Sequence, residues 1–279
     1  MTDQPEQRIA LGIEYNGQAY AGWQFQAGKP SVQAVLQKAL AVIANQEIIV
    51  HCAGRTDAGV HAFEQVVHFD TDVLRPMQSW LRGVNTYLPP DVRVIWAQAV
   101  DAGFHARYQA IARCYRYVIL NRRVHSALLQ GQATWVYQDL DAARMHAAAQ
   151  ALLGEHDFSS FRAQSCQSVS PKRHMYFIDV YRQHDQVIID ICANAFLHHM
   201  VRNIVGSLID VGSGKRDLGW IADLLALKDR HQAAMTAPPD GLHLLAVFYP
   251  ETCGIPVHPI FTRLPPDARR FDCPRGMIR

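Results

Sequence analysis

The fold is decided by the stretch EIIVHCAGRTDAGVHAFEQVVHF, residues 47–69. Its two ends, residues 47–52 and 63–69, are rich in β-branched and aromatic side chains, which favour extended structure. Between them lies a short loop with two glycines and one carboxylate, Asp57. Glycine lets the backbone take positive φ or approach a ligand closely. We therefore expect two strands joined by a loop that holds Asp57 in a fixed place.

Around this stretch the first half of the chain alternates strands and helices. Helical spacing of apolar residues over 31–44, with Ser31 as N-cap, predicts one helix, and residues 77–88 predict a second that ends at Pro89. Strands are expected at 8–15 and 92–100. The predicted order is β-α-β-β-α-β.

The second half repeats this order with insertions. Strands are expected at 113–120, 176–182, 187–192 and 242–249, and helices at 141–153, 196–211 and 218–227. This doubling predicts an α+β fold of two ferredoxin-like, RRM-like halves that form a mostly antiparallel sheet with a central catalytic cleft. We expect one domain over 1–105, a second over 106–250, and an extended proline-rich tail over 251–279.

Composition excludes several classes of protein. Hydrophobic residues make up 49% and charged residues 19% of the 279, as in an ordered globular chain. We find no signal peptide and no apolar run long enough to cross a bilayer. The six cysteines lack C-x-x-C spacing, which argues against a zinc site and a disulfide framework. Each is expected to be a small buried hydrophobe in a reduced, cytoplasmic protein.

Charge is distributed unevenly although the net charge is only +2. Residues 102–138 contain no acidic side chain and five arginines, namely Arg107, Arg113, Arg116, Arg122 and Arg123. A basic stripe of this kind suits contact with nucleic-acid phosphates. Arginines that guard a solvated strand edge are the alternative interpretation.

Asp57 is the first candidate for chemistry. A carboxylate on such a loop can be a nucleophile, a general base, a metal ligand or a turn-capping side chain. The metal role is weak, because a hard cation needs several oxygen ligands and no second carboxylate lies nearby in sequence. Arg55 and Thr56 on the same loop favour an ionised carboxylate, which suits a nucleophile or base.

Two further stretches carry signal. Residues 196–206 predict a helix with Arg202 in an apolar setting, where an arginine needs a carboxylate partner unless it extends to water. Asp57 is one such partner. Tyr115 and Tyr117 fall on the same face of the strand at 113–120, where a tyrosine can stack on a base or pack as an ordinary strand residue.

Taken together, these motifs resemble those of the tRNA pseudouridine synthase A (TruA) family over residues 8–250. The motifs that carry the resemblance are GRTDAGVH at 54–61, RCYRY at 113–117, FLHHMVRN at 196–203 and APPDGL at 237–242.

The resemblance implies an isomerase that needs no cofactor and no metal. It would convert uridine to pseudouridine in the anticodon stem-loop of tRNA, at positions 38–40, as a homodimer. By the same resemblance, Asp57 is the essential aspartate, Tyr115 stacks on the target base, Arg202 pairs with the aspartate, Arg55 helps to hold the flipped nucleotide, and Leu242 lines the pocket.

Two other functions compete with this interpretation. A non-catalytic pair of RRM-like modules would bind tRNA without changing it, although the typical RRM aromatic signature is absent. A hydrolase that uses Asp57 and His61 would release free uracil and leave an abasic site.

Overall fold

A computed structural model describes residues 7–256 of the chain. These residues form two compact units, the first of residues 7–111 and 244–256 and the second of residues 112–243. None of the helices within residues 7–256 has the length and apolarity that a membrane crossing requires. The predicted tail, residues 251–279, lies mostly outside the described residues. Its described part, residues 251–256, contains the short 3-10 helix η6 (Glu251–Cys253).

The first unit follows the predicted β-α-β-β-α-β order. Its elements are β1 (Gln7–Tyr15), the 3-10 turn η1 (Gly17–Ala19), α1 (Val32–Ala44), β2 (His51–Cys52), β3 (His61–Thr71), the π-helical turn η2 (Ser79–Gly83), α2 (Val84–Tyr87) and β4 (Val92–Val100). β1 pairs antiparallel with both β3 and β4, and β2 pairs with β3. The sheet order is β4-β1-β3-β10, where β10 (Leu242–Phe248) enters this unit at Leu244.

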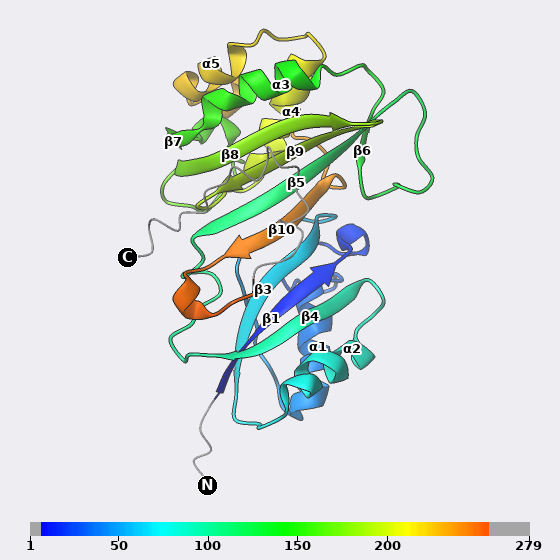
Figure 1. Cartoon of the computed structure of the whole chain (residues 1–279), viewed down its shortest axis with the longest axis vertical. Coiled ribbons are helices and arrows are strands. Elements are labelled where there is room, and N and C mark those ends of the chain that lie inside the picture. Colours follow the sequence, from blue (N-terminus) through cyan, green and yellow to red (C-terminus); the bar gives the residue numbers. More distant parts are fainter. Residues whose placement is uncertain (1–6, 257–279) are drawn as a thin grey trace. The chain divides into compact units, whose positions relative to one another are not determined.

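Helix α1 packs on this sheet because its sequence is amphipathic and capped. The Ser31 hydroxyl accepts a hydrogen bond from the Ala34 amide at 3.3 Å, as an N-cap does. Its buried side chains include Leu36 and Leu40. In Figure 1, α1 and α2 lie beside β1 and β4.

The predicted strand over 47–52 is wrong except for its last two residues, His51 and Cys52. Side chains of α1 take the backbone groups that a longer strand would need. Gln37 accepts from the Val50 amide at 3.2 Å, and Gln33 donates to the Val50 carbonyl at 3.4 Å. Because the Val50 amide and carbonyl already have these hydrogen-bond partners, they do not pair with a neighbouring strand.

The second unit repeats the strand-and-helix order. Its elements are β5 (Ala112–Asn121), β6 (Thr134–Val136), α3 (Ala142–Ala149), η3 (Gln150–Leu152), β7 (Gly154–Asp157), η4 (Ser159–Phe161), β8 (Lys172–Gln183), β9 (Gln186–Ala193), α4 (Met200–Gly212), α5 (Trp220–Leu227) and η5 (Arg230–Gln232). Strands β5, β9, β8 and β7 follow one another in antiparallel pairs, and β6 pairs parallel with β5. Figure 1 shows α3, α4 and α5 gathered beside β8 and β9. The α+β class and the mostly antiparallel pairing are confirmed.

Two details of the second unit differ from the sequence prediction. Strands β6 and β7 were not predicted, because three- and four-residue strands carry too little alternation to detect. The helix expected over 196–211 begins only at Met200. His199, directly before it, has φ of 60° in the left-handed region, and a residue in that conformation interrupts an α-helix.

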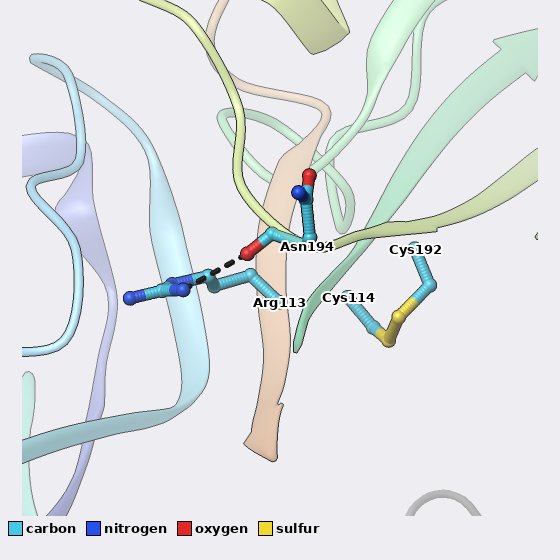
Figure 2. The surroundings of a disulfide bond; sticks show 4 residues. All are labelled: Arg113, Cys114, Cys192 and Asn194. Carbon is cyan, nitrogen blue, oxygen red and sulfur yellow. Dashed lines mark hydrogen bonds between the residues drawn. A yellow bond between two sulfur atoms is a disulfide. The ribbon is translucent and has the colours of Figure 1, made fainter. Parts of the chain in front are cut away.

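The prediction that each cysteine is a small buried hydrophobe is wrong for the described cysteines. Cys52, Cys166 and Cys253 are half-buried, and the two fully buried cysteines are bonded to each other. Cys114 of β5 and Cys192 of β9 lie directly opposite each other and form a disulfide, with Cα atoms 4.1 Å apart. Figure 2 shows this bond beside the hydrogen bond from Arg113 to the Asn194 carbonyl, which measures 3.0 Å. Cysteine spacing could not reveal the pair, because 78 residues separate its members and only the strand register brings them together.

Glu64 of β3 is a buried acid in the first unit. Its side chain is completely buried, and neither carboxylate oxygen has a hydrogen-bond partner among the described residues. Burial raises the pKa of Glu64 to about 8, and the nearby Trp96 indole, which stops short of hydrogen-bond geometry, lowers that pKa only in part. Trp96 lies so close over β1 that a side chain at Gly12 would meet its Nε1 atom. Glu64 is therefore neutral in the folded protein at pH 7.

Replacing Glu64 by glutamine should change how stability depends on pH. Because the folded pKa lies above the unfolded value, the folded state keeps a proton that the unfolded state releases between about pH 4.5 and 8. The wild-type free energy of unfolding should fall over that interval relative to Glu64→Gln, by on the order of 4 kcal/mol. Urea unfolding at stepped pH measures the difference. Glu14→Gln, an exposed acid on β1, is the control and should stay parallel to wild type.

Candidate active site

The loop that carries Asp57 is held at its start by backbone and side-chain hydrogen bonds to β3. At its start the Ala53 amide donates to the Val66 carbonyl at 2.8 Å. The Gln65 side chain donates to the Gly54 carbonyl at 2.5 Å and accepts from the Gly54 amide at 3.4 Å. Gln65 itself is completely buried. The hydrogen bonds to Val66 and Gln65 of β3 therefore fix the position of the first loop residues after β2.

The middle of the loop is anchored from a different segment. The Trp23 amide donates to the Thr56 carbonyl at 3.0 Å, and the Thr56 hydroxyl lies 2.8 Å from that of Tyr15 on β1. Thr56 is buried, whereas Asp57 is half-buried and Arg55 is exposed. The backbone is thus fixed through buried Thr56, and the charged residues on either side of it are less buried than Thr56 is.

Gly22 makes the close approach possible. It has φ of 99°, and a Cβ atom placed there would lie 2.7 Å from the Thr56 carbonyl oxygen and 3.0 Å from the Asp57 carbonyl carbon. Both facts exclude an ordinary side chain. Sequence analysis missed Gly22 because a single glycine 35 residues before Asp57 carries no visible signal.

His61 has a structural role in the first unit. It is 4% exposed, and its Nδ1 atom accepts a hydrogen bond from the Gly17 amide at 3.1 Å. Through this hydrogen bond, His61 holds the start of β3 against η1. The hydrolase alternative, which required His61 as a catalytic partner, finds no support in this placement.

In the second unit, Tyr115 and Tyr117 of β5 are both buried but differ in their surroundings. Tyr115 is 9% exposed and packs edge-to-face on Phe196, with ring centroids 5.1 Å apart. The Tyr117 hydroxyl donates to the Pro238 carbonyl at 2.7 Å and lies 2.6 Å from the Thr134 hydroxyl. Tyr115 therefore contacts an aromatic ring, while Tyr117 tethers the segment that precedes β10.

Arg202 tethers the same segment from α4. Its Nε atom donates to the Ala237 carbonyl at 2.8 Å, and the Ala237 amide donates back to the Arg202 carbonyl at 3.1 Å. Its side chain is half-buried. Leu242, 5% exposed, closes the segment with a hydrogen bond from its amide to the Pro239 carbonyl. Three of the four sequence motifs thus meet at residues 237–242.

Of the predicted site residues, Arg55 and Asp57 share a loop in the first unit, and Tyr115, Arg202 and Leu242 belong to the second. Within either unit taken by itself, no three His, Cys, Asp or Glu side chains among the described residues bring ligand atoms close enough to hold a metal ion.

Comparisons with known proteins agree with these motifs. A sequence profile described as tRNA pseudouridine synthase matches residues 12–109 and 148–250. The tRNA pseudouridine synthase A of Methylococcus capsulatus is 56% identical over 264 residues, which cover 95% of this chain and 97% of that protein. Its counterpart in Shewanella baltica is 57% identical over 249 residues, covering 89% of this chain and 95% of the relative.

Among solved structures, an archaeal box H/ACA sRNP Nop10–Cbf5 complex aligns with 72% of this chain and 44% of its own, at 12% identity and a TM-score of 0.31. That score is too low to support any inference about this chain. The profile and the sequence relatives are sufficient on their own.

A chain that matches the profile over both segments and its relatives over nearly their whole length belongs to the tRNA pseudouridine synthase family. It is an isomerase, and the resemblance drawn from the four motifs is confirmed. The matched segments include Asp57, Arg55, Arg202 and Leu242, whereas Tyr115 lies in the interval between them.

Replacing Gly22 by alanine should disturb the Asp57 loop far more than an equal substitution elsewhere. Gly28→Ala is the matched control, because Gly28 also has positive φ, of 75°, but has open space around its Cβ position. Both variants carry the backbone strain of about 1 kcal/mol, and only Gly22→Ala adds the collision with Thr56 and Asp57. We expect at least a tenfold larger loss of turnover in Gly22→Ala than in Gly28→Ala. Equal losses would contradict the role of Gly22.

Proposed function

We propose that this enzyme isomerises uridines in the anticodon stem-loop of tRNA, at positions 38–40, with Asp57 as the essential carboxylate. The observation that carries the proposal is the Asp57 loop, whose backbone is fixed through Thr56, Gly54 and Gly22 while Asp57 stays half-buried. A preorganised carboxylate avoids the entropy of ordering at the moment of reaction.

The reaction itself requires little besides positioning and one carboxylate. The bond between C1′ and N1 breaks and a bond between C1′ and C5 forms, while the proton on C5 is lost to solvent and N1 gains a proton from solvent. Nothing is oxidised or reduced and no group is added. An ionised Asp57 serves in each of three routes, which are attack on C1′, attack on C6 of the base, and removal of the C2′ proton.

The other site residues have distinct proposed roles. Arg202 keeps Asp57 ionised by pairing with it, and Arg55 helps to hold the flipped nucleotide through its phosphate. Tyr115 stacks on the uracil while it turns, and Leu242 supplies an apolar wall. Extrusion of the target base costs a few kcal/mol, which these contacts offset.

The family resemblance also underlies our proposal that the enzyme works as a homodimer in the cytoplasm, with tRNA as its partner. Analytical ultracentrifugation of the full chain tests the first part, and a monomer at micromolar concentration would contradict it.

Replacing Asp57 by asparagine should abolish the reaction and spare binding. Conversion of uridine to pseudouridine releases tritium from C5 of labelled tRNA, which gives the assay. We expect Asp57→Asn to lower release by at least about 10²- to 10⁴-fold, as loss of a catalytic acid or base does. Binding of unmodified tRNA should stay within about threefold.

Asp72→Asn, an exposed acid in the first unit, is the control for that experiment. Normal turnover by Asp57→Asn would refute the assignment. Product analysis separates the alternatives, because an RNA-binding module leaves the nucleosides unchanged and a hydrolase releases uracil.

Replacing Arg202 by methionine should damage catalysis more than stability. The substitution removes the hydrogen bond from Nε to the Ala237 carbonyl, and the loss of that bond lowers the free energy of unfolding by about 1 kcal/mol. If its charge also holds Asp57 ionised, the turnover rate should fall by at least about 10²-fold.

Arg230→Met is the matched control for Arg202. Arg230 donates to the Ala233 and Ala234 carbonyls and to Asn203 and Thr236, so it braces the same stretch of chain without a proposed part in the chemistry. Arg230→Met should lose more stability and less turnover than Arg202→Met. The reverse order would contradict the proposed pairing.

A further inference from the structure

The turn at residues 105–109 is rigidly attached to the first unit through Ala106. The Ala106 amide donates to His68 Nδ1 at 3.2 Å, and the Ala106 carbonyl accepts from the Tyr249 hydroxyl at 2.6 Å. Ala106 is completely buried. Burial also lowers the pKa of His68 to about 4, so its ring stays neutral and Nδ1 remains an acceptor. The turn is therefore fixed before any partner arrives.

Local hydrogen bonds complete the turn. The Nδ1 atom of His105 accepts from the Arg107 amide at 3.1 Å and from the Tyr108 amide at 3.4 Å. The Gln109 side chain accepts from the His105 amide at 2.8 Å. Because the backbone is satisfied internally, the side chains of Arg107 and Tyr108 point outward, and both residues are exposed.

These outward side chains form a cationic aromatic surface. Tyr108 is 75% exposed, and the Arg107 guanidinium lies 5.7 Å from its ring centroid. Tyr108 also lies beside two further rings, with centroids 4.2 Å apart for Tyr108 and His105 and 5.7 Å apart for His105 and His51. An aromatic ring held in water on a rigid turn is the kind of feature that a binding partner uses.

The same surface lies near the Asp57 loop. His51 and Cys52 form β2, and the loop begins directly after them. The His51 ring lies 5.7 Å, centroid to centroid, from the ring of His105 in the turn. His51 therefore brings the turn close to the start of the Asp57 loop within the first unit.

We infer that one surface of the first unit binds a nucleotide of the substrate RNA that flanks the uridine at Asp57. This surface, the Tyr108 patch, consists of His51, His105, Arg107 and Tyr108. The base of that nucleotide stacks on the Tyr108 ring, and its phosphate contacts Arg107. The inference rests on the proposed function. An aromatic face beside a guanidinium is what single-stranded nucleic acid requires, because bases stack and phosphates pair with arginine. The turn also lies within the acid-free stretch of residues 102–138, so no carboxylate follows it in sequence before Asp139.

The test measures RNA affinity in the Asp57→Asn background, where no turnover intervenes. The probes are an unmodified tRNA transcript and its isolated anticodon stem-loop. Tyr108→Ala should weaken binding of both by on the order of tenfold, and Tyr108→Phe, which keeps the ring, should restore it. Arg107→Gln should weaken binding and reduce the slope of log affinity against log salt by about one.

Two control variants change residues that do not belong to the Tyr108 patch. Tyr87→Ala and Arg82→Gln change an exposed tyrosine and an exposed arginine of the same unit and should leave affinity unchanged. Unchanged affinity in both Tyr108→Ala and Arg107→Gln would overturn the inference, as would an effect on the transcript that the stem-loop lacks. Pseudouridine formation by the wild type is scored separately. Its absence refutes the proposed function, whereas loss of affinity in the variants still reports an RNA contact.

Discussion

The site depends on one constraint, the attachment of the Asp57 loop to a segment that precedes it by more than 30 residues. Trp23 donates to the Thr56 carbonyl, and Gly22 lets the two backbones touch. Without this contact the middle of the loop would keep the contact of the Thr56 hydroxyl with Tyr15 but lose the backbone attachment through Trp23, and a β2 of two residues gives little support. The contact converts a flexible connection into a platform that fixes the Asp57 backbone while leaving its side chain half-buried.

In the second unit, an irregular segment is likewise held in place, here by hydrogen bonds from several different elements. Residues 237–242 contain two prolines and a glycine and form no helix or strand until Leu242. They are nevertheless held by Arg202 from α4, by Tyr117 from β5 and by the Thr134 hydroxyl, which donates to Asp240 at 2.6 Å. This explains why the motifs at 113–117, 196–203 and 237–242 occur in one chain, since each supplies part of a single hydrogen-bonded cluster.

The sequence predicted these elements to different degrees. Periodicity located β4 and α1 almost to the residue, because long alternating or amphipathic runs are strong signals. It failed where a tertiary contact decides the outcome. Gln33 and Gln37 shorten β2, and the left-handed His199 delays α4. For the site, the sequence motifs identified Asp57, Arg202 and Tyr115 as candidates. The residues that contact them, namely Gly22 at the Asp57 loop, Ala237 at Arg202 and Phe196 at Tyr115, are known only from the folded structure.

The register of β5 has a second, non-covalent support besides the Cys114–Cys192 disulfide. Arg116 lies two residues after Cys114 and forms two hydrogen bonds of 2.8 Å to the Asp190 carboxylate directly opposite it on β9. Tyr181 of β8 donates to the same carboxylate at 3.0 Å. Asp190 is completely buried, so sliding β5 by one residue would strand an unpaired charge, at a cost of several kcal/mol. The position of Tyr115 on β5 therefore follows from this ion pair whether the two sulfurs are bonded or reduced.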